Sequence, residues 1–347
     1  MEISRLEELL GAFPSRRILV VGDFFLDEYR IIDRRLSETS LETGLEAYQV
    51  VERRTSPGAA GNVAANLAAL GCQVTTLGVI GQDGQGFELK QVLFNSGVDP
   101  RGLIESVEVV TPTYTKPIAV ESDGRRHELE RQDIKNRAPL PASLEADVIR
   151  RLKEMLPGVD GVVVADQVVE SGCGVITTRV RDAISQLAAD HPKVVVAVDS
   201  RARIGLFRQM ILKPNAPEAL TAIDPAGVYD SSLERLQACA EQLFQRAARP
   251  VFLTVGDQGI LLASAAGCQR VPAVPVSGEI DIVGAGDSCM AGLTAALACG
   301  AQPLEAAFFG SLVASVTIRQ IGITGTASPN QIRAQYQQYF SNPKVTR

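Results

Sequence analysis

Short apolar runs rich in β-branched residues alternate with amphipathic or alanine-rich segments along nearly the whole chain. The apolar runs predict strands at 17–22, 73–80, 161–166, 194–199, 251–255 and 259–263. Helices are predicted at 60–70, 84–96, 143–156, 174–190, 231–248, 286–299 and 303–318. Continuous apolar strands separated by helices indicate a parallel sheet that is covered on both faces. Because such crossovers are right-handed, we expect an α/β fold with a doubly wound, mainly parallel sheet.

Two segments interrupt this alternation. Residues 28–56 and 110–134 lack a helical period and contain runs in which apolar and polar residues alternate. We expect these segments to form antiparallel strands that pair along one edge of the main domain, as a small β lid over a cleft. The remaining residues, 1–27, 57–109 and 135–347, would then form one α/β domain with the lid inserted into it.

Charge and hydropathy argue against two classes of partner. Lys and Arg total 34 and Asp and Glu total 40, giving a net charge of −6 without a long basic run, so we expect no nucleic acid partner. The longest apolar stretches, such as 159–165, are far shorter than the ~20 residues that span a membrane. The acidic residues Glu2, Glu7 and Glu8 do not suit a signal peptide. We therefore expect a cytoplasmic protein with no membrane partner.

The cysteines and histidines do not indicate a catalytic or metal site. The 6 cysteines are scattered without a CxxC pair, and the chain has only 2 histidines. Scattered cysteines are typical of small buried side chains in a reducing compartment. We therefore expect neither a histidine-based metal site nor a histidine-containing triad.

The strongest local signal is the run Asp-Ile-Val-Gly-Ala-Gly-Asp at residues 281–287, which precedes an alanine-rich helix. Gly284, Ala285 and Gly286 are small enough for the backbone to approach a ligand closely. The helix would begin at about Ala285 to Asp287, where free N–H groups and the helix dipole form an anion site. The Asp287 carboxylate either caps the helix or acts as a general base for a hydroxyl nucleophile.

A second small-residue turn reads Pro-Gly-Ala-Ala-Gly-Asn at residues 57–62 and opens a predicted helix that ends at Gly71. Gly58 and Gly61 permit a tight turn. The Asn62 side chain either caps the helix or hydrogen-bonds a hydroxyl group of a ligand.

Two further turns lie at the ends of predicted strands. In the run from Lys213 to Glu218, the Asn215 amide and the Glu218 carboxylate could face a hydrated Mg²⁺ ion, and Lys213 could meet a phosphate. The alternative is an ordinary helix start with Glu218 in the first turn. The run Thr-Val-Gly-Asp-Gln-Gly at 254–259 either cradles a nucleotide or joins two strands as a hairpin.

Together and in this order, the four motifs resemble the ribokinase-like, or phosphofructokinase-B, family of sugar and nucleoside kinases. The resemblance covers almost the whole chain, including the lid. One family signature is matched by Gly58, Asn62, Ala64, Gly71 and Gly81, and the other by Asp281, residues 284–287, Ala291 and Gly292. Pro57 and Ile282 depart from these signatures, but neither position carries a reacting group.

Within the family, the chain looks most like the kinases that act on D-glycero-D-manno-heptose 7-phosphate. The segments that carry this likeness are 21–29, 35–37, 57–64 and 321–326. Residues 37–45 and 166–170 differ from the usual runs of those kinases, and they fall where sugar specificity is expected. Some such proteins carry a fused nucleotidyltransferase half, which we do not expect here because the chain ends at Arg347.

The resemblance implies phosphoryl transfer from ATP to a sugar hydroxyl, with Asp287 as general base and the amides of residues 284–287 stabilising the transferred group. The implied sugar ligands are Asp27, Gly58 and Asn62, with Lys116, Arg131 and Asp133 as sugar-phosphate contacts. The implied nucleotide-binding residues are Lys213, Asn215, Thr254, Gly256, Gly259, Gly310 and Ser311.

The resemblance also implies metal ions and a partner. Asn215 and Glu218 would hold Mg²⁺ through its waters, and Asp281 would lie near a monovalent cation such as K⁺, held by carbonyls near 282–283 and 319–325. Lids of this family often pair between subunits, and an exposed alternating strand at 45–52 would offer an unpaired edge, so we expect a homodimer through the lid.

The sequence is also compatible with related functions. A kinase of the same family could act on ribose, ketodeoxygluconate, a fructose phosphate or a nucleoside, and a catalytically silent relative could bind a sugar or nucleotide. A dinucleotide-dependent enzyme needs GxGxxG after the first strand, where this chain has the single Gly22, and no GxxxxGK[ST] run is present.

Overall fold

The computed structural model describes residues 1–227 and 230–341, and its larger sheet has nine strands. These are β1 (Arg17–Gly22), β6 (Gln73–Gly81), β7 (Leu103–Ser106), β11 (Gly161–Asp166), β12 (Val195–Ser200), β13 (Ile211–Leu212), β14 (Val251–Thr254), β15 (Ile260–Ser264) and β16 (Gly267–Val271). They lie in the order β16-β15-β14-β13-β12-β11-β1-β6-β7. Strands from β7 to β14 run parallel, and β15 and β16 add an antiparallel edge.

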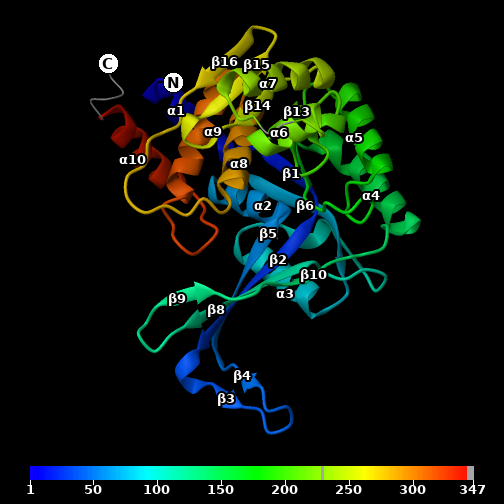
Figure 1. The fold of residues 1–347 in the computed structure, drawn as a ribbon. Helices are drawn as coiled ribbons and strands as arrows, with labels where there is room; N and C mark the ends of the chain where they lie inside the picture. Colours follow the sequence, from blue (N-terminus) through cyan, green and yellow to red (C-terminus); the bar gives the residue numbers. More distant parts are fainter. Residues whose placement is uncertain (228–229, 342–347) are drawn as a thin grey trace.

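Helices cover both faces of this sheet (Figure 1). They are α1 (Ile3–Ala12), α2 (Ala60–Ala69), α3 (Gly84–Asn95), α4 (Ala142–Met155), α5 (Thr178–Asp190), α6 (Ala216–Ile223), α7 (Leu233–Ala247), α8 (Ala285–Ala298), α9 (Pro303–Thr317) and α10 (Pro329–Phe340). Successive residues of β1 point into two separate apolar layers: Ile18 and Val20 pack with α1, α2, α8 and α9, whereas Leu19 and Val21 pack with α4, α5 and α7. This double burial explains the continuous apolar character of the strands.

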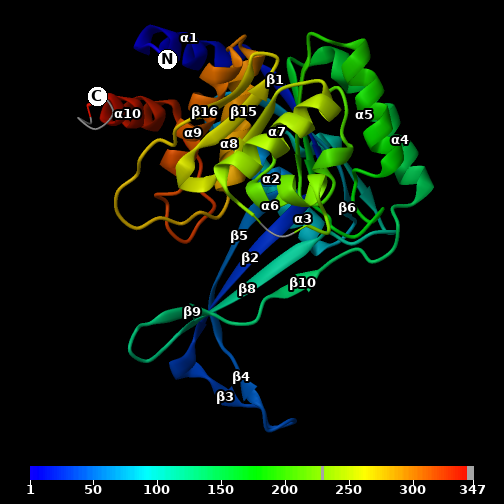
Figure 2. The same cartoon turned by 45° about the horizontal axis from the view of Figure 1, so that its top comes forward.

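A smaller sheet projects away from the α/β body (Figure 2). Its strands are β2 (Phe24–Asp33), β5 (Val50–Ala59), β8 (Thr113–Val120), β9 (Arg126–Glu128) and β10 (Gln132–Ile134). A separate hairpin of β3 (Glu38–Thr39) and β4 (Glu46–Ala47) lies at its far end. The expected alternating strand at 45–52 is therefore broken between β4 and β5. Pairing is antiparallel except between β2 and β8, which run parallel.

Very short connections join the small sheet to the body. Asp23 alone separates β1 from β2, and β5 ends at Ala59 immediately before α2 begins at Ala60. The buried Asp23 carboxylate accepts hydrogen bonds from the N–H groups of Gln167, Val168 and Val175, at 2.8, 3.0 and 2.7 Å. Burial raises the pKa of Asp23 to about 6, with Asp166 adding to the rise. The start of the small sheet is thus tied to the loop that follows β11.

The observed architecture confirms the predicted fold class, a mainly parallel α/β sheet with a smaller, mostly antiparallel one. The predicted strands and helices of the large domain are all present, and α1, α6, α10, β7, β13 and β16 are additions. Within residues 1–227 and 230–341, the structure contains no helix with the length and apolar character of a membrane span.

Candidate active site

The turn before α8 has the backbone geometry of an anion site. Gly284 adopts φ +78°, and a side chain at this position would come within 2.6 Å of the Thr324 methyl carbon, so glycine is required there. The N–H of Ala285 donates to the carbonyl of Ile282 at 3.1 Å. In the described part of the chain, no protein acceptor faces the N–H groups of Gly286 and Asp287. These two amides remain available at the positive end of the α8 dipole.

Asp287 lies at this turn, partly exposed, on the first turn of α8. Its Oδ2 accepts a hydrogen bond of 3.1 Å from Nδ2 of Asn62, a buried residue of α2. Burial raises the pKa of Asp287 to about 7, and Asp199 adds to the rise, while Lys213 and Asn62 oppose it. A carboxyl group that titrates near neutral pH is suited to accept a proton from an alcohol.

Lys213 lies beneath the turn and is almost fully buried. Its Nζ is 2.8 Å from Oδ2 of Asp199, at the end of β12, and would be 3.6 Å from a Cβ on Gly286. Burial lowers the pKa of Lys213, but the charge of Asp199 outweighs burial, so the pKa lies above its ordinary value. A permanent positive charge therefore lies close to the open amides, as a phosphate site requires.

Asn215 and Glu218 begin α6 as a reciprocal capping box. The Glu218 N–H donates to Asn215 Oδ1 at 2.9 Å, and the Asn215 N–H donates to Glu218 Oε2 at 2.8 Å. Burial and then Asp199 raise the pKa of Glu218 to about 7, against the opposing charge of Lys213. Capping occupies one carboxylate oxygen of Glu218 and leaves the other free, and Asp199 places a second carboxylate nearby. A bound cation would offset the repulsion between these two carboxylates.

Two of the candidate sugar ligands, Asp27 and Gly58, lie on the small sheet. Asp27 is buried on β2, and Lys116 on β8 places Nζ 3.4 Å from Asp27 Oδ2 and 3.3 Å from Tyr29 Oη. A Cβ on Gly58 would come within 2.8 Å of Asp27 Oδ1, so the missing side chain makes room for this carboxylate. Burial raises the pKa of Asp27 even though Lys116 opposes the rise.

The other sequence candidates are less closely gathered. Arg131 pairs with Asp133, with Nε 2.8 Å from Oδ1, and its guanidinium stacks 4.6 Å from the Tyr114 ring centroid. Asp281 accepts from the N–H groups of Val283 and Gly322, at 3.0 and 3.1 Å, and so joins the two loops expected around a monovalent cation.

The candidate nucleotide residues divide into two groups. The Thr254 N–H donates to the Pro214 carbonyl at 2.9 Å, which places Thr254 beside Asn215. Gly256 and Gly259 form the tight turn between β14 and β15, which is an antiparallel hairpin. In contrast, Gly310 is buried where α9 packs on α8, and the Ser311 hydroxyl accepts from the Val274 N–H at 3.2 Å. These two residues make packing contacts in the structure, and their nucleotide role stays a prediction.

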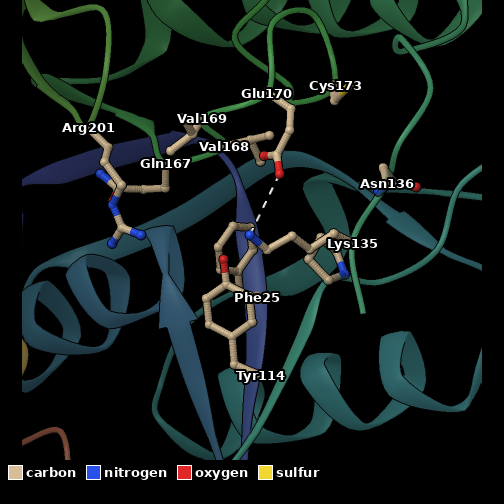
Figure 3. Close-up of a pocket in the computed structure, with 11 residues that line it drawn as sticks. Phe25, Tyr114, Lys135, Asn136, Gln167, Val168, Val169, Glu170, Cys173 and Arg201 are labelled. Atoms are coloured by element: carbon tan, nitrogen blue, oxygen red, sulfur yellow. Dashed lines mark ion pairs between the residues drawn. The ribbon is translucent and has the colours of Figure 1, made fainter. Parts of the chain in front are cut away.

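Sequence reasoning missed a second group of side chains beside this site. Asp199 pairs with Lys213, and Arg201 follows two residues later. Arg201 and Lys135 line a cavity together with Phe25 and Tyr114 (Figure 3). The signal that points to Asp199 is its place at the carboxyl end of a parallel strand, the edge of an α/β sheet where ligands bind.

A model of the pfkB family of carbohydrate kinases matches residues 18–331. The chain belongs to this family. The membership confirms the enzyme class predicted from the sequence, an ATP-dependent carbohydrate kinase. The chain is 32% identical over 338 residues to the bifunctional protein HldE of Citrifermentans bemidjiense and 30% identical over 337 residues to that of Trichlorobacter lovleyi. Each alignment covers 96% of this chain but 66% and 65% of the relative, so the chain spans just under two thirds of their length.

Solved structures of this family share the fold. The Arabidopsis thaliana ribokinase complexed with ribose and ATP aligns with a TM-score of 0.67 at 18% identity, over 92% of this chain and 98% of that one. The phosphofructokinase-2 of Escherichia coli in complex with fructose-6-phosphate aligns with a TM-score of 0.68 at 19% identity, over 94% and 99%. At these identities the likeness concerns the fold alone.

Proposed function

We propose that this carbohydrate kinase transfers the γ-phosphoryl group of ATP to a hydroxyl group of D-glycero-D-manno-heptose 7-phosphate. The observation that carries the chemistry is Asp287, hydrogen-bonded to Asn62 beside two open amides and the buried Lys213. The segments shared with heptose 7-phosphate kinases and the similarity to proteins named HldE support the acceptor. A coupled assay of ADP release over heptose 7-phosphate, fructose phosphates, ribose, ketodeoxygluconate and nucleosides tests it. Heptose 7-phosphate should give the highest kcat/KM, and a clear preference for another acceptor contradicts the assignment.

The reaction follows from the placement of these groups. Asp287 accepts the hydroxyl proton as the acceptor oxygen forms a bond to the γ-phosphorus and the bond from that phosphorus to the ADP oxygen breaks. The N–H groups of Gly286 and Asp287 donate to the transferred phosphoryl oxygens, and Lys213 offsets their charge. Asp27 and Asn62 orient the sugar, with Gly58 leaving room for the Asp27 carboxylate.

Mg²⁺ fits the chemistry of the Asn215 and Glu218 pair. The charge of Asp199 acts on both Glu218 and Asp287, and Lys213 is the buried cation that opposes it, so a group of carboxylates that favours a cation lies here. When bound with ATP, Mg²⁺ neutralises phosphate charge, and Asn215 and Glu218 would hold it through water. We further propose that Asp281 shapes a monovalent-cation site, that the protein is cytoplasmic, and that Val50 and Val51, exposed at the edge strand β5, contribute to a lid-mediated homodimer.

Replacing Glu218 with Gln is expected to raise the Mg²⁺ concentration for half-maximal activity by about tenfold or more. Glutamine preserves the capping box but removes the charge that acts on the ion. The measurement is a Mg²⁺ titration of kcat/KM at fixed ATP. Glu234→Gln is the control, because Glu234 occupies the first turn of α7 and is exposed. An unchanged titration in Glu218→Gln contradicts the Mg²⁺ role.

Activity should depend on pH near neutrality. Burial and Asp199 raise the pKa of Asp287 to about 7, and a general base works only when deprotonated. We therefore expect kcat/KM to decrease as pH falls, by up to about tenfold per pH unit below pH 7. Because Glu218 titrates in the same range, the profile reports the carboxyl group pair. A pH–rate profile that is flat down to about pH 5 rules out this assignment.

A further inference from the structure

A cavity opens between the small sheet and the loop after β11. Its aromatic wall is formed by Phe25 on β2 and Tyr114 on β8, whose ring centroids lie 5.1 Å apart in an edge-to-face arrangement. Gln167 and Val168 line the opposite side. Figure 3 shows the side chains of Lys135 and Arg201 entering this space from different segments.

Positive charge exceeds negative charge around this cavity. Lys135 Nζ is 3.7 Å from Glu170 Oε1 and 5.6 Å from the Tyr114 ring centroid (Figure 3). The same Glu170 oxygen is 3.6 Å from Arg137 Nη1, so two cations share one carboxylate. Arg201 is exposed, and within the described residues no carboxylate lies within ion-pair distance of it. Lys135 can therefore bind another anion while Arg137 still neutralises Glu170.

Two residues that line the cavity adjoin the candidate active site. The Arg201 N–H donates to the Asp166 carbonyl at 3.0 Å, which fixes Arg201 at the carboxyl end of the sheet, two residues after Asp199. On the other side, Tyr114 is the cross-strand partner of Asp27, a proposed sugar ligand. A sugar bound by Asp27 would therefore lie beside the cavity wall that Tyr114 forms.

We propose that Arg201 and Lys135 bind the phosphate group that the acceptor sugar already carries, and that this contact selects a sugar phosphate over the free sugar. A phosphate monoester presents the oxygens that a guanidinium and an ammonium bind best, and the aromatic wall suits the carbon face of the sugar. The proposal rests on the proposed function, because it places the reacting hydroxyl at Asp287.

The variants Arg201→Met and Lys135→Met test it. The measured quantity is the ratio of kcat/KM for a sugar phosphate to kcat/KM for the same sugar without phosphate, using heptose 7-phosphate and heptose, and fructose 6-phosphate and fructose. Each variant should lower this ratio by about 10- to 100-fold, since charged hydrogen bonds to the phosphate are lost. Arg101→Met is the matched control: its exposed side chain pairs with Asp99 and does not line the cavity, so the ratio should stay within about threefold of wild type.

Two results would overturn the proposal. Equal losses for both members of a pair would show that Arg201 and Lys135 act on ATP or on structure, and a wild-type preference for the free sugar would exclude a phosphate pocket. If the wild type phosphorylates no sugar tested, the proposed function fails. Calorimetry with fructose 6-phosphate then decides whether the phosphate site exists. Binding that Arg201→Met weakens about tenfold or more would keep the phosphate site, and absence of binding to wild type would reject it.

Discussion

Replacing Asp287 with Asn is expected to lower kcat for sugar phosphorylation by about 10²- to 10⁴-fold. The asparagine oxygen can still accept the hydrogen bond from Asn62 Nδ2, so the shape of the site is preserved, but the amide cannot take the hydroxyl proton. The measurement is kcat at saturating ATP and acceptor. Asp182→Asn serves as the control, because it makes the same change at an exposed position on α5.

The same variant should not lose stability. The pKa of Asp287 rises from 3.8 to about 7 on folding, so the folded chain binds this proton more tightly than the unfolded chain. The contribution of this group to the free energy of unfolding is therefore present below about pH 4 and is lost as pH rises towards 7. At pH 8 the Asn variant should melt at or above the wild-type temperature. A kcat near that of wild type would reject Asp287 as the base.

Replacing Arg203 with Met is expected to lower the free energy of unfolding by about 3–5 kcal/mol. Asp166 is fully buried at the end of β11, and Arg203 binds both its oxygens, with Nη2 2.6 Å from Oδ1 and Nε 3.1 Å from Oδ2. Ser200 Oγ donates the remaining hydrogen bond at 2.6 Å. Removing the guanidinium leaves a buried carboxylate without its cation. Urea denaturation of wild type and variant measures the difference.

A double-mutant cycle separates the ion pair from other effects. Asp166→Asn combined with Arg203→Met should recover part of the stability that Arg203→Met loses, because no unpaired charge then remains buried. Arg203 also donates to the carbonyls of Val168 and Val169, so it holds the loop that lines the cavity. Strictly additive losses in the double variant would show that these backbone contacts, and not the charge pair, account for the effect.

Sequence periodicity was sufficient for the parts of the fold that are buried on both sides. In runs such as 161–166, every residue before the terminal Asp is apolar or glycine. A strand in the middle of an α/β sheet needs this continuous apolar pattern because both of its faces are buried. It was insufficient for α10, where buried Ile332 and Tyr336 are separated by polar residues, and for β16, whose residues are mostly exposed. The parallel pairing of β8 with β2 is set by tertiary contacts that no local pattern contains.

The candidate site, like the fold, could be predicted only in part from the sequence. The 57–62 and 281–287 motifs each predicted a turn from local residues, and the structure joins them through the Asn62 to Asp287 hydrogen bond. The roles of Asp199, Lys135 and Arg201 depend on which strand ends and lid segments become neighbours. Since separate parts of the sequence supply these side chains, only their positions near strand ends could have suggested them.

The direct passage from β5 into α2 connects the small sheet to Asn62, the hydrogen-bond partner of the proposed base. Because no loop separates β5 from α2, bending of β5 would rotate the first residues of α2. This rotation would move Asn62 away from Asp287. An enzyme that holds ATP but no sugar would then have a misaligned proton acceptor as well as an open cleft. Sugar binding and alignment of the proton acceptor would then occur together. This coupling would limit transfer of the γ-phosphoryl group from ATP to water.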